Sequence, residues 1–207
     1  DDNYFDRAEL KNSARRIENE ADRMDRLVGQ LLDMTTIEAG RFTLKKEDVP
    51  VTALFGQIRK TYFPMMNGGH NRLIINNESE LTLYADRERV LQILVNLVSN
   101  ACKYTQDGEI TLSGELKDAV LISVTDTGEG MTQETLSALF TRYPSMRGGV
   151  KGVHGNGLGL FISKKIAEAH GGEIGVESEL GKGTKVWFTI PLPCTAATGI
   201  VLRKPKC

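Results

Sequence analysis

The spacing of apolar residues changes abruptly near Gly40, and this change divides the chain into two parts that must fold differently. Before it, apolar side chains recur in a strict four-three alternation on an otherwise charged segment, at Leu10, Ala14, Ile17, Ala21, Met24, Val28 and Leu31. This heptad pattern predicts one long helix, with Gly40 as its C-cap. After Arg41 the apolar runs are short and alternate between strand-like and helix-like spacing, so we expect a domain boundary there.

A narrow apolar seam on a charged helix predicts self-association, and we expect a homodimer through the N-terminal helix. The alternative is an amphipathic helix that lies on its own domain, because alanine supplies two of the seam positions. The resulting division is residues 1–41 as a helical region, residues 42–193 as a globular domain, and residues 194–207 as a tail or linker.

The second part of the chain mixes short strands with helices without a regular strand-helix-strand alternation. We expect helices at residues 51–66, 86–104, 132–140 and 158–170. Strands are expected at residues 43–49, 73–77 and 81–85, with hairpins formed by residues 109–115 and 120–126 and by residues 173–178 and 185–191. This order predicts an α+β fold, a mixed sheet covered on one face by helices.

Composition excludes several functions. With Lys+Arg 26 against Asp+Glu 27, the 207-residue chain has a formal net charge of -1, which gives no reason to expect nucleic-acid binding or membrane contact by this chain. Cys102, Cys194 and Cys207 show no C-x-x-C spacing, so neither a disulfide framework nor a zinc site is expected. We expect a cytoplasmic location, with any membrane anchor of the parent protein outside this chain, because no apolar run approaches the roughly 20 residues of a span.

An acidic residue stands where an apolar strand ends. Asp126 begins the segment DTGEG, which follows the apolar run 120–124 and precedes a helix. A carboxylate there could accept a hydrogen bond from an exocyclic amine, while Gly128 and Gly130 let a flat ring approach the backbone. Taken alone, the segment is more typical of an ordinary turn.

A glycine-rich loop leads into a later helix. The segment GNGLGL contains Gly155, Gly157 and Gly159, and the unpaired amides of a helix start are suited to phosphate. Neither the strand-helix-strand context of a dinucleotide-binding fold nor a Walker-type phosphate loop is present.

Two amides and an ammonium share one face of the helix expected at residues 86–104. Asn96, Asn100 and Lys103 recur at i, i+4 and i+7. One side-chain oxygen can bind a hydrated Mg²⁺ while the lysine meets phosphate. The alternative is structural, since asparagine often bonds to neighbouring backbone.

These segments, with a turn at residues 181–184, together resemble the GHKL ATPase superfamily, and specifically the ATP-binding catalytic domain of sensor histidine kinases. Residues 96–104 (NLVSNACKY) look like the N box, 126–130 the first glycine box and 139–143 the F box. Residues 155–160 are similar to the second glycine box and 181–184 (GKGT) to the third. The resemblance implies a Bergerat-type two-layer α/β sandwich that binds ATP and Mg²⁺ under a lid at residues 141–156.

The family's roles carry over residue by residue. Asp126 would bind the adenine amino group with Thr184 nearby, and Asn100 would hold Mg²⁺. The other nucleotide-binding residues implied are Asn96, Lys103, Tyr104, Gly128, Gly130, Gly155, Gly157, Leu158 and Gly159. Three basic lid residues are candidate phosphate contacts: Arg142, Arg147 and Lys151.

The resemblance also indicates a branch of the superfamily. Hydrolytic relatives place a glutamate one helical turn before the Mg²⁺-binding asparagine, whereas this chain has Asn96, which cannot take a proton from water. The N-terminal helix looks like the second helix of a dimerisation and phosphotransfer domain. The family's phosphoacceptor histidine is absent, since His70, His154 and His170 do not stand in a run of the H-box type.

We therefore predict a kinase region that positions Mg-ATP for transfer to a histidine outside this chain, for relay to a response regulator. The chain by itself is predicted not to phosphorylate itself. The alternatives are a GHKL protein that is not a histidine kinase, such as a hydrolytic ATPase or an anti-sigma-factor serine kinase, and an inert dimerising scaffold.

Overall fold

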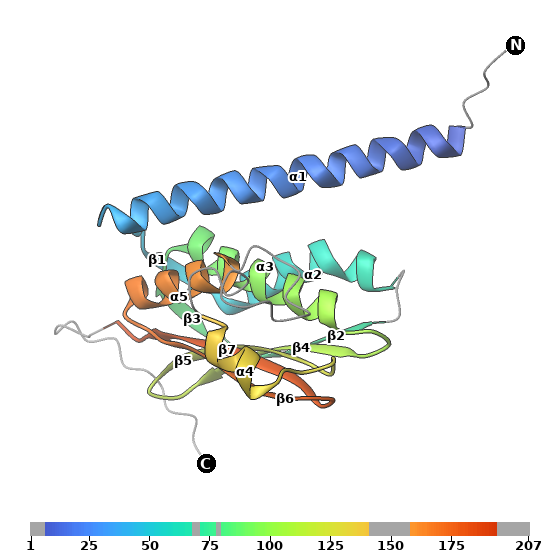
Figure 1. Ribbon diagram of the computed structural model, residues 1–207. Coiled ribbons are helices and arrows are strands. Elements are labelled where there is room, and N and C mark those ends of the chain that lie inside the picture. Colours follow the sequence, from blue (N-terminus) through green and yellow to red (C-terminus); the bar gives the residue numbers. More distant parts are fainter. Residues whose placement is uncertain (1–6, 68–70, 78–79, 141–157, 194–207) are drawn as a thin grey trace, which may run out of the picture.

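The computed structural model describes residues 7–67, 71–77, 80–140 and 158–193 (Figure 1). It begins with a long helix, α1 (Arg7–Glu38), which runs along the side of the helical layer that faces away from the sheet. Gly40 follows the last turn with a φ of 63°, and the Arg41 N–H donates to the Thr36 carbonyl at 3.0 Å. The predicted C-cap is confirmed, because a left-handed residue lets the next amides reach the final carbonyls of the helix.

The centre of the domain is a five-stranded mixed sheet in the order β2-β4-β5-β7-β6. Its strands are β2 (Arg72–Asn77), β4 (Glu109–Leu116), β5 (Ala119–Asp126), β6 (Ile174–Glu179) and β7 (Gly183–Pro191). Only the β2 and β4 pair is parallel. Both predicted hairpins are confirmed, as is the α+β class with helices on one face of a mixed sheet.

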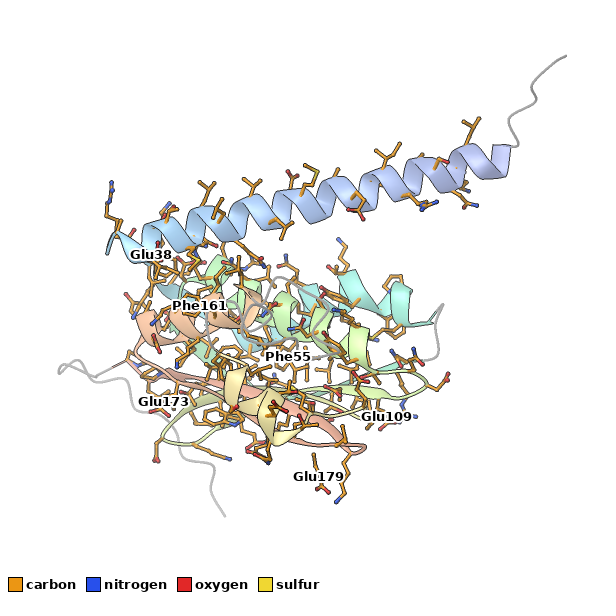
Figure 2. All side chains as sticks on the ribbon, viewed as in Figure 1. Glu38, Phe55, Glu109, Phe161, Glu173 and Glu179 are labelled. Atoms are coloured by element: carbon orange, nitrogen blue, oxygen red, sulfur yellow. The ribbon has the colours of Figure 1, made fainter. Side chains whose placement is uncertain are left out.

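Three helices cover one face of this sheet: α2 (Val51–Asn67), α3 (Arg87–Tyr104) and α5 (Leu158–His170). The buried side chains of α3 recur every three or four residues, at Val90, Ile93, Leu94, Leu97, Val98 and Ala101. They meet alternate residues of the strands, such as Ile110 and Ile122, which are fully buried. Phe55 of α2, labelled in Figure 2, belongs to the same core. The short helix α4 (Gln133–Ala138) follows β5.

The first helix is joined to the domain near its C-terminal end. Met34 is 2% exposed and belongs to the core, while Asp33 accepts hydrogen bonds from Arg89 and from Gln92 of α3, each at 2.6 Å. The Arg89 guanidinium also stacks 5.0 Å from the centre of the Phe42 ring. The earlier seam residues do not face the domain, since Ile17 is 70% exposed.

Two predicted boundaries were wrong. The first strand, expected at residues 43–49, is β1 (Glu47–Pro50), which pairs with β3 (Thr82–Ala85) as a separate two-stranded sheet. Residues before Glu47 serve another purpose: the Lys45 N–H donates to Asp86, the N-cap of α3, at 2.9 Å. The helix expected at residues 132–140 is shorter at both ends, because Thr132 is its N-cap and Leu139 its C-cap.

Candidate functional site

The site begins with a row of three polar side chains across neighbouring strands. Asp126 at the end of β5 pairs with Thr184 of β7, and Thr184 pairs with Ser178 of β6. Residues directly opposite in adjacent strands project from the same face, here the face that the helices cover. In Figure 2 Glu173 lies just before β6 and Glu179 is its last residue, and this row lies at the Glu179 end.

Asp126 is 8% exposed, and its carboxylate accepts a hydrogen bond from the Gly128 N–H at 2.9 Å. Burial raises the pKa of Asp126, while the N–H groups of Gly128 and Thr184 and the hydroxyl of Thr105 oppose that rise. Thr105 lies beside the carboxylate, but its hydroxyl makes no hydrogen bond of good geometry with a described residue. The site therefore holds an acceptor that is shielded from water.

Two glycines bring backbone segments together beside Asp126. A Cβ on Gly128 would lie 2.2 Å from the carbonyl oxygen of Tyr104 at the end of α3. Gly130 has a φ of 66°, and a Cβ there would lie 2.0 Å from the carbonyl oxygen of Glu179. Larger residues would force these segments apart, which explains glycine at both positions.

The Asn96 side chain connects α3 to α5. Its amide nitrogen donates to the hydroxyl of Ser163 at 3.0 Å, and Ser163 is 2% exposed. Its amide oxygen lies against the start of α5, where a Cβ on Gly159 would come within 2.2 Å of it. Both ends of the amide are thus engaged by the helix that begins at Leu158.

Asn100 and Lys103, which share one face of α3 with Asn96, lie further along the helix. Asn100 is partly exposed, and its side-chain amide makes no hydrogen bond to another described residue. Lys103 is exposed and turns back on its neighbour, with its ammonium 3.0 Å from the Tyr104 hydroxyl and 4.8 Å from the ring centre. The described residues contain no cluster of three or more His, Cys, Asp or Glu side chains suited to a metal. Asn100 therefore stays the candidate for Mg²⁺, as a hard side-chain oxygen that suits a hydrated ion.

Several predicted residues lie outside the described part of the chain. They are Gly155 and Gly157, the lid residues Arg142, Arg147 and Lys151, and the histidines His70 and His154. Leu158 and Gly159 open α5, and Leu158 is buried at 7% exposure.

Ser163, Ser178 and Thr105 were not predicted as site residues. Ser163 and Thr105 are small hydroxyl residues, and the side chains beside which they lie, Asn96 and Asp126, are distant from them in sequence, so no local pattern marks them. The strand register could have shown Ser178, because it lies opposite Thr184 in the predicted hairpin.

An open hollow elsewhere in the domain does not coincide with this site. It is lined by residues 75–77 of β2 and 113–115 of β4, at the opposite end of β4 from the register partner of Asp126. It contains one charged side chain, Glu115. We place the candidate site at the Asp126 end because the acceptors, glycines and asparagines converge there.

Comparison with known proteins shows the family. Residues 85–194 match the model of the histidine kinase-, DNA gyrase B- and HSP90-like ATPases. The chain belongs to this family. Since the matched span contains α3, the Asp126 segment and the last hairpin, the site described above lies within it. No helix among the described residues is long and apolar enough to cross a membrane.

Individual relatives include a sensor protein and histidine kinases of known structure. The chain is 35% identical over 188 residues to the sensor protein SrrB of Staphylococcus aureus, covering 89% of this chain and 32% of SrrB. The solved structure of full-length ShkA in complex with AMPPNP has a TM-score of 0.73 and 28% identity, covering 90% of this chain and 41% of ShkA. The Acinetobacter baumannii histidine kinase AdeS has a TM-score of 0.71 and 21% identity over 89% of this chain and 85% of AdeS, which shows a shared fold. These likenesses identify an ATP-binding region of the histidine kinase type, although the chain spans about a third of SrrB.

Proposed function

We propose that this chain binds Mg-ATP between α3 and the Asp126 end of the sheet, and positions its γ-phosphoryl group for transfer to a histidine outside the chain. The observation that carries the proposal is the shielded acceptor Asp126, whose following loop packs against the end of α3, the helix on which the Asn100 amide makes no hydrogen bond to another described residue. ShkA, a relative of similar fold, was solved with an ATP analogue, which supports the same ligand for this chain.

Each residue has a physical role in this proposal. Asp126 accepts a hydrogen bond from the adenine amino group, with Thr184 beside it in the same row. Gly128 and Gly130 keep the loop after Asp126 close to its neighbours. Asn100 offers its oxygen to Mg²⁺, and Lys103 is free to swing from Tyr104 to phosphate because it is exposed. The metal would supply neutralisation of the phosphate charge.

The reaction is proposed to be transfer rather than hydrolysis. An amide at Asn96 has no basicity with which to activate water, and Ser163 and Gly159 hold it in place. Without a base at that position, we expect bound ATP to await an acceptor.

The histidine that the structure describes is unsuited to be that acceptor. His170 is 5% exposed, its Nε2 accepts the Asp86 N–H at 3.0 Å, and its Nδ1 lies 2.8 Å from the Ile166 carbonyl. We propose that the chain cannot phosphorylate itself. Radioactive label from γ-labelled ATP that resists base and is lost in acid, as phosphohistidine is, would contradict this.

Two partners follow from the same proposal. The exposed apolar face of α1 would pair with a second copy, because Ile17, Met24 and Val28 are each more than half exposed. A response regulator would receive the phosphoryl group, by analogy with ThkA, a histidine kinase of similar fold (TM-score 0.67, 24% identity) solved in complex with the response regulator TrrA. A cytoplasmic location is consistent with the free thiol of Cys102.

Calorimetric titration with Mg-ATP tests the nucleotide site. We expect the unchanged chain to bind ATP with negligible phosphate release, and Asp126→Asn to bind at least tenfold more weakly, because the amide offers one acceptor oxygen and a competing donor. Asp118→Asn, the same change at an exposed position between β4 and β5, is the control and should bind normally. Rapid phosphate release would favour the hydrolytic alternative, and no binding would favour the scaffold.

A further inference from the structure

We propose that Ser178 fixes the direction of the Thr184 hydroxyl, so that Thr184 can only accept hydrogen bonds from a base beside Asp126. Ser178 would then be a positioning residue that favours 6-amino purines over 6-oxo purines. This inference rests on the proposed nucleotide site and assigns a role to a residue that would not itself touch the nucleotide.

The Ser178 hydroxyl is the centre of three contacts. It accepts the Met131 N–H at 2.9 Å and donates to the Gly183 carbonyl at 2.9 Å. Its oxygen also lies 2.9 Å from the Thr184 hydroxyl oxygen. Ser178 thereby joins the segment after Asp126 to the start of β7.

The proton count decides the direction of the third contact. A serine hydroxyl has one hydrogen and two lone pairs. With its hydrogen on the Gly183 carbonyl and one lone pair occupied by the Met131 N–H, Ser178 can only accept from Thr184. All three contacts are hydrogen bonds together only when the Thr184 hydroxyl donates to Ser178, and this arrangement leaves Thr184 with its two lone pairs as its remaining polar capacity.

Asp126, Thr184 and Ser178 form one row across three neighbouring strands. Thr184 lies between Ser178 and Asp126, directly opposite each in the sheet. Because the Thr184 proton is committed to Ser178, the side chains of Thr184 and Asp126 both present acceptors. An exocyclic amine can donate to two acceptors, whereas a carbonyl oxygen at the same position of the ring would meet unfavourable lone pairs.

The backbone around Ser178 keeps this arrangement rigid. The Gly181 N–H donates to the Glu129 carbonyl at 2.7 Å, and Gly183 has a φ of 103° with its Cα close to β5. The two segments that Ser178 joins are therefore held together on both sides of it, which limits rotation of the hydroxyl network.

The test compares two nucleotides that differ at the 6-position of the purine. Mg-ATP and Mg-inosine triphosphate, the 6-oxo analogue, would be titrated into the unchanged chain, Ser178→Ala and Ser178→Thr. In Ser178→Ala the Thr184 hydroxyl is released and can turn to donate to a 6-oxo group. We expect the preference for ATP to fall about tenfold in Ser178→Ala, and to be retained in Ser178→Thr, which keeps a hydroxyl.

A second side-chain hydrogen bond in the same hairpin, at Thr189, provides the control. Thr189 accepts the Glu173 N–H at 2.9 Å at the opposite end of β6 and β7, so Thr189→Ala removes a comparable bond away from the row. It should leave the nucleotide preference unchanged. If Ser178→Ala does not fold by circular dichroism, Ser178→Cys takes its place, since a thiol is a weak donor and acceptor.

The outcomes separate this inference from the proposed function. A loss of affinity for both nucleotides by the same factor in Ser178→Ala, or an unchanged preference, would overturn the role of Ser178 while leaving the ATP site standing. Failure of the unchanged chain to bind ATP would instead refute the proposed function. A reduced preference restored by Ser178→Thr supports the inference.

Discussion

Gly181, in the turn before β7, and Gly183, the first residue of β7, differ in how closely they approach β5, so a matched pair of substitutions tests that contact. Gly181 and Gly183 both have positive φ, at 80° and 103°. A Cβ on Gly181 would meet nothing within 4 Å, whereas one on Gly183 would lie 2.0 Å from the Asp126 carbonyl oxygen and 2.9 Å from the Thr127 Cα. Gly181→Ala therefore introduces backbone strain alone, while Gly183→Ala adds a collision with fixed backbone.

The magnitudes follow from that difference. An alanine in the left-handed region costs about 1 to 2 kcal/mol, which is our expectation for Gly181→Ala. Contacts of a real Cβ under 3.0 Å are essentially absent, so Gly183→Ala must move β5 from β7 by about 1 Å. Breaking the hydrogen bond from the Thr184 N–H to the buried Asp126 adds about 1 to 3 kcal/mol.

Urea denaturation followed by circular dichroism would measure both free energies of unfolding, and calorimetry would measure Mg-ATP binding. We expect Gly183→Ala to be less stable than Gly181→Ala by at least about 1 kcal/mol and to bind ATP more weakly, because Asp126 moves with β5. Equal stabilities and equal affinities would show that the strands separate without penalty, and would refute the reasoning.

Three further predictions concern the helices. Neutral His170 has a lowered pKa, mainly because it is buried, so the unfolded chain binds this proton first. The contribution of His170 to the free energy of unfolding should be highest above its ordinary pKa of 6.5. It should fall by up to about 1.4 kcal/mol per pH unit as the pH drops toward the pKa in the folded chain. Urea denaturation of His170→Gln at several pH values should lack this pH-dependent contribution. Asp33→Asn should weaken the attachment of α1 by about 1 to 3 kcal/mol, seen as faster amide hydrogen exchange in the last turns of α1, while Asp25→Asn at an exposed position of the same helix should leave exchange unchanged. Gly159→Ala should displace Asn96, break its bond to Ser163 and destabilise the protein by about 1 to 3 kcal/mol in thermal unfolding, whereas Gly56→Ala in α2, with nothing within 4 Å, should stabilise it by up to about 1 kcal/mol.

Much of the fold was predictable because the spacing of apolar residues within single helices and strands indicates it. Buried residues alternate along β4 and β5 and recur every three or four residues in α3. Each of these patterns lies within a single strand or helix, so it can be recognised from that segment of sequence alone. The first strand was placed four residues too early, because β propensity says nothing about where its partner β3 begins. The seam of α1 was left with two interpretations. Ile17 does not pack on the domain, whereas Met34 nearer the end of the helix does, and self-association stays a prediction.

The sequence by itself determined which residue types could act at the site. An acid at the end of an apolar strand, glycines after it, and two asparagines one helical turn apart are all local features. Tertiary structure alone decided their partners. Ser163 reaches Asn96 across two helices, and the Ser178 hydroxyl takes the Met131 N–H 47 residues away in sequence. Such contacts depend on strand order and helix packing. These are determined by many weak contacts between residues that are distant in sequence, so no short stretch of sequence predicts them.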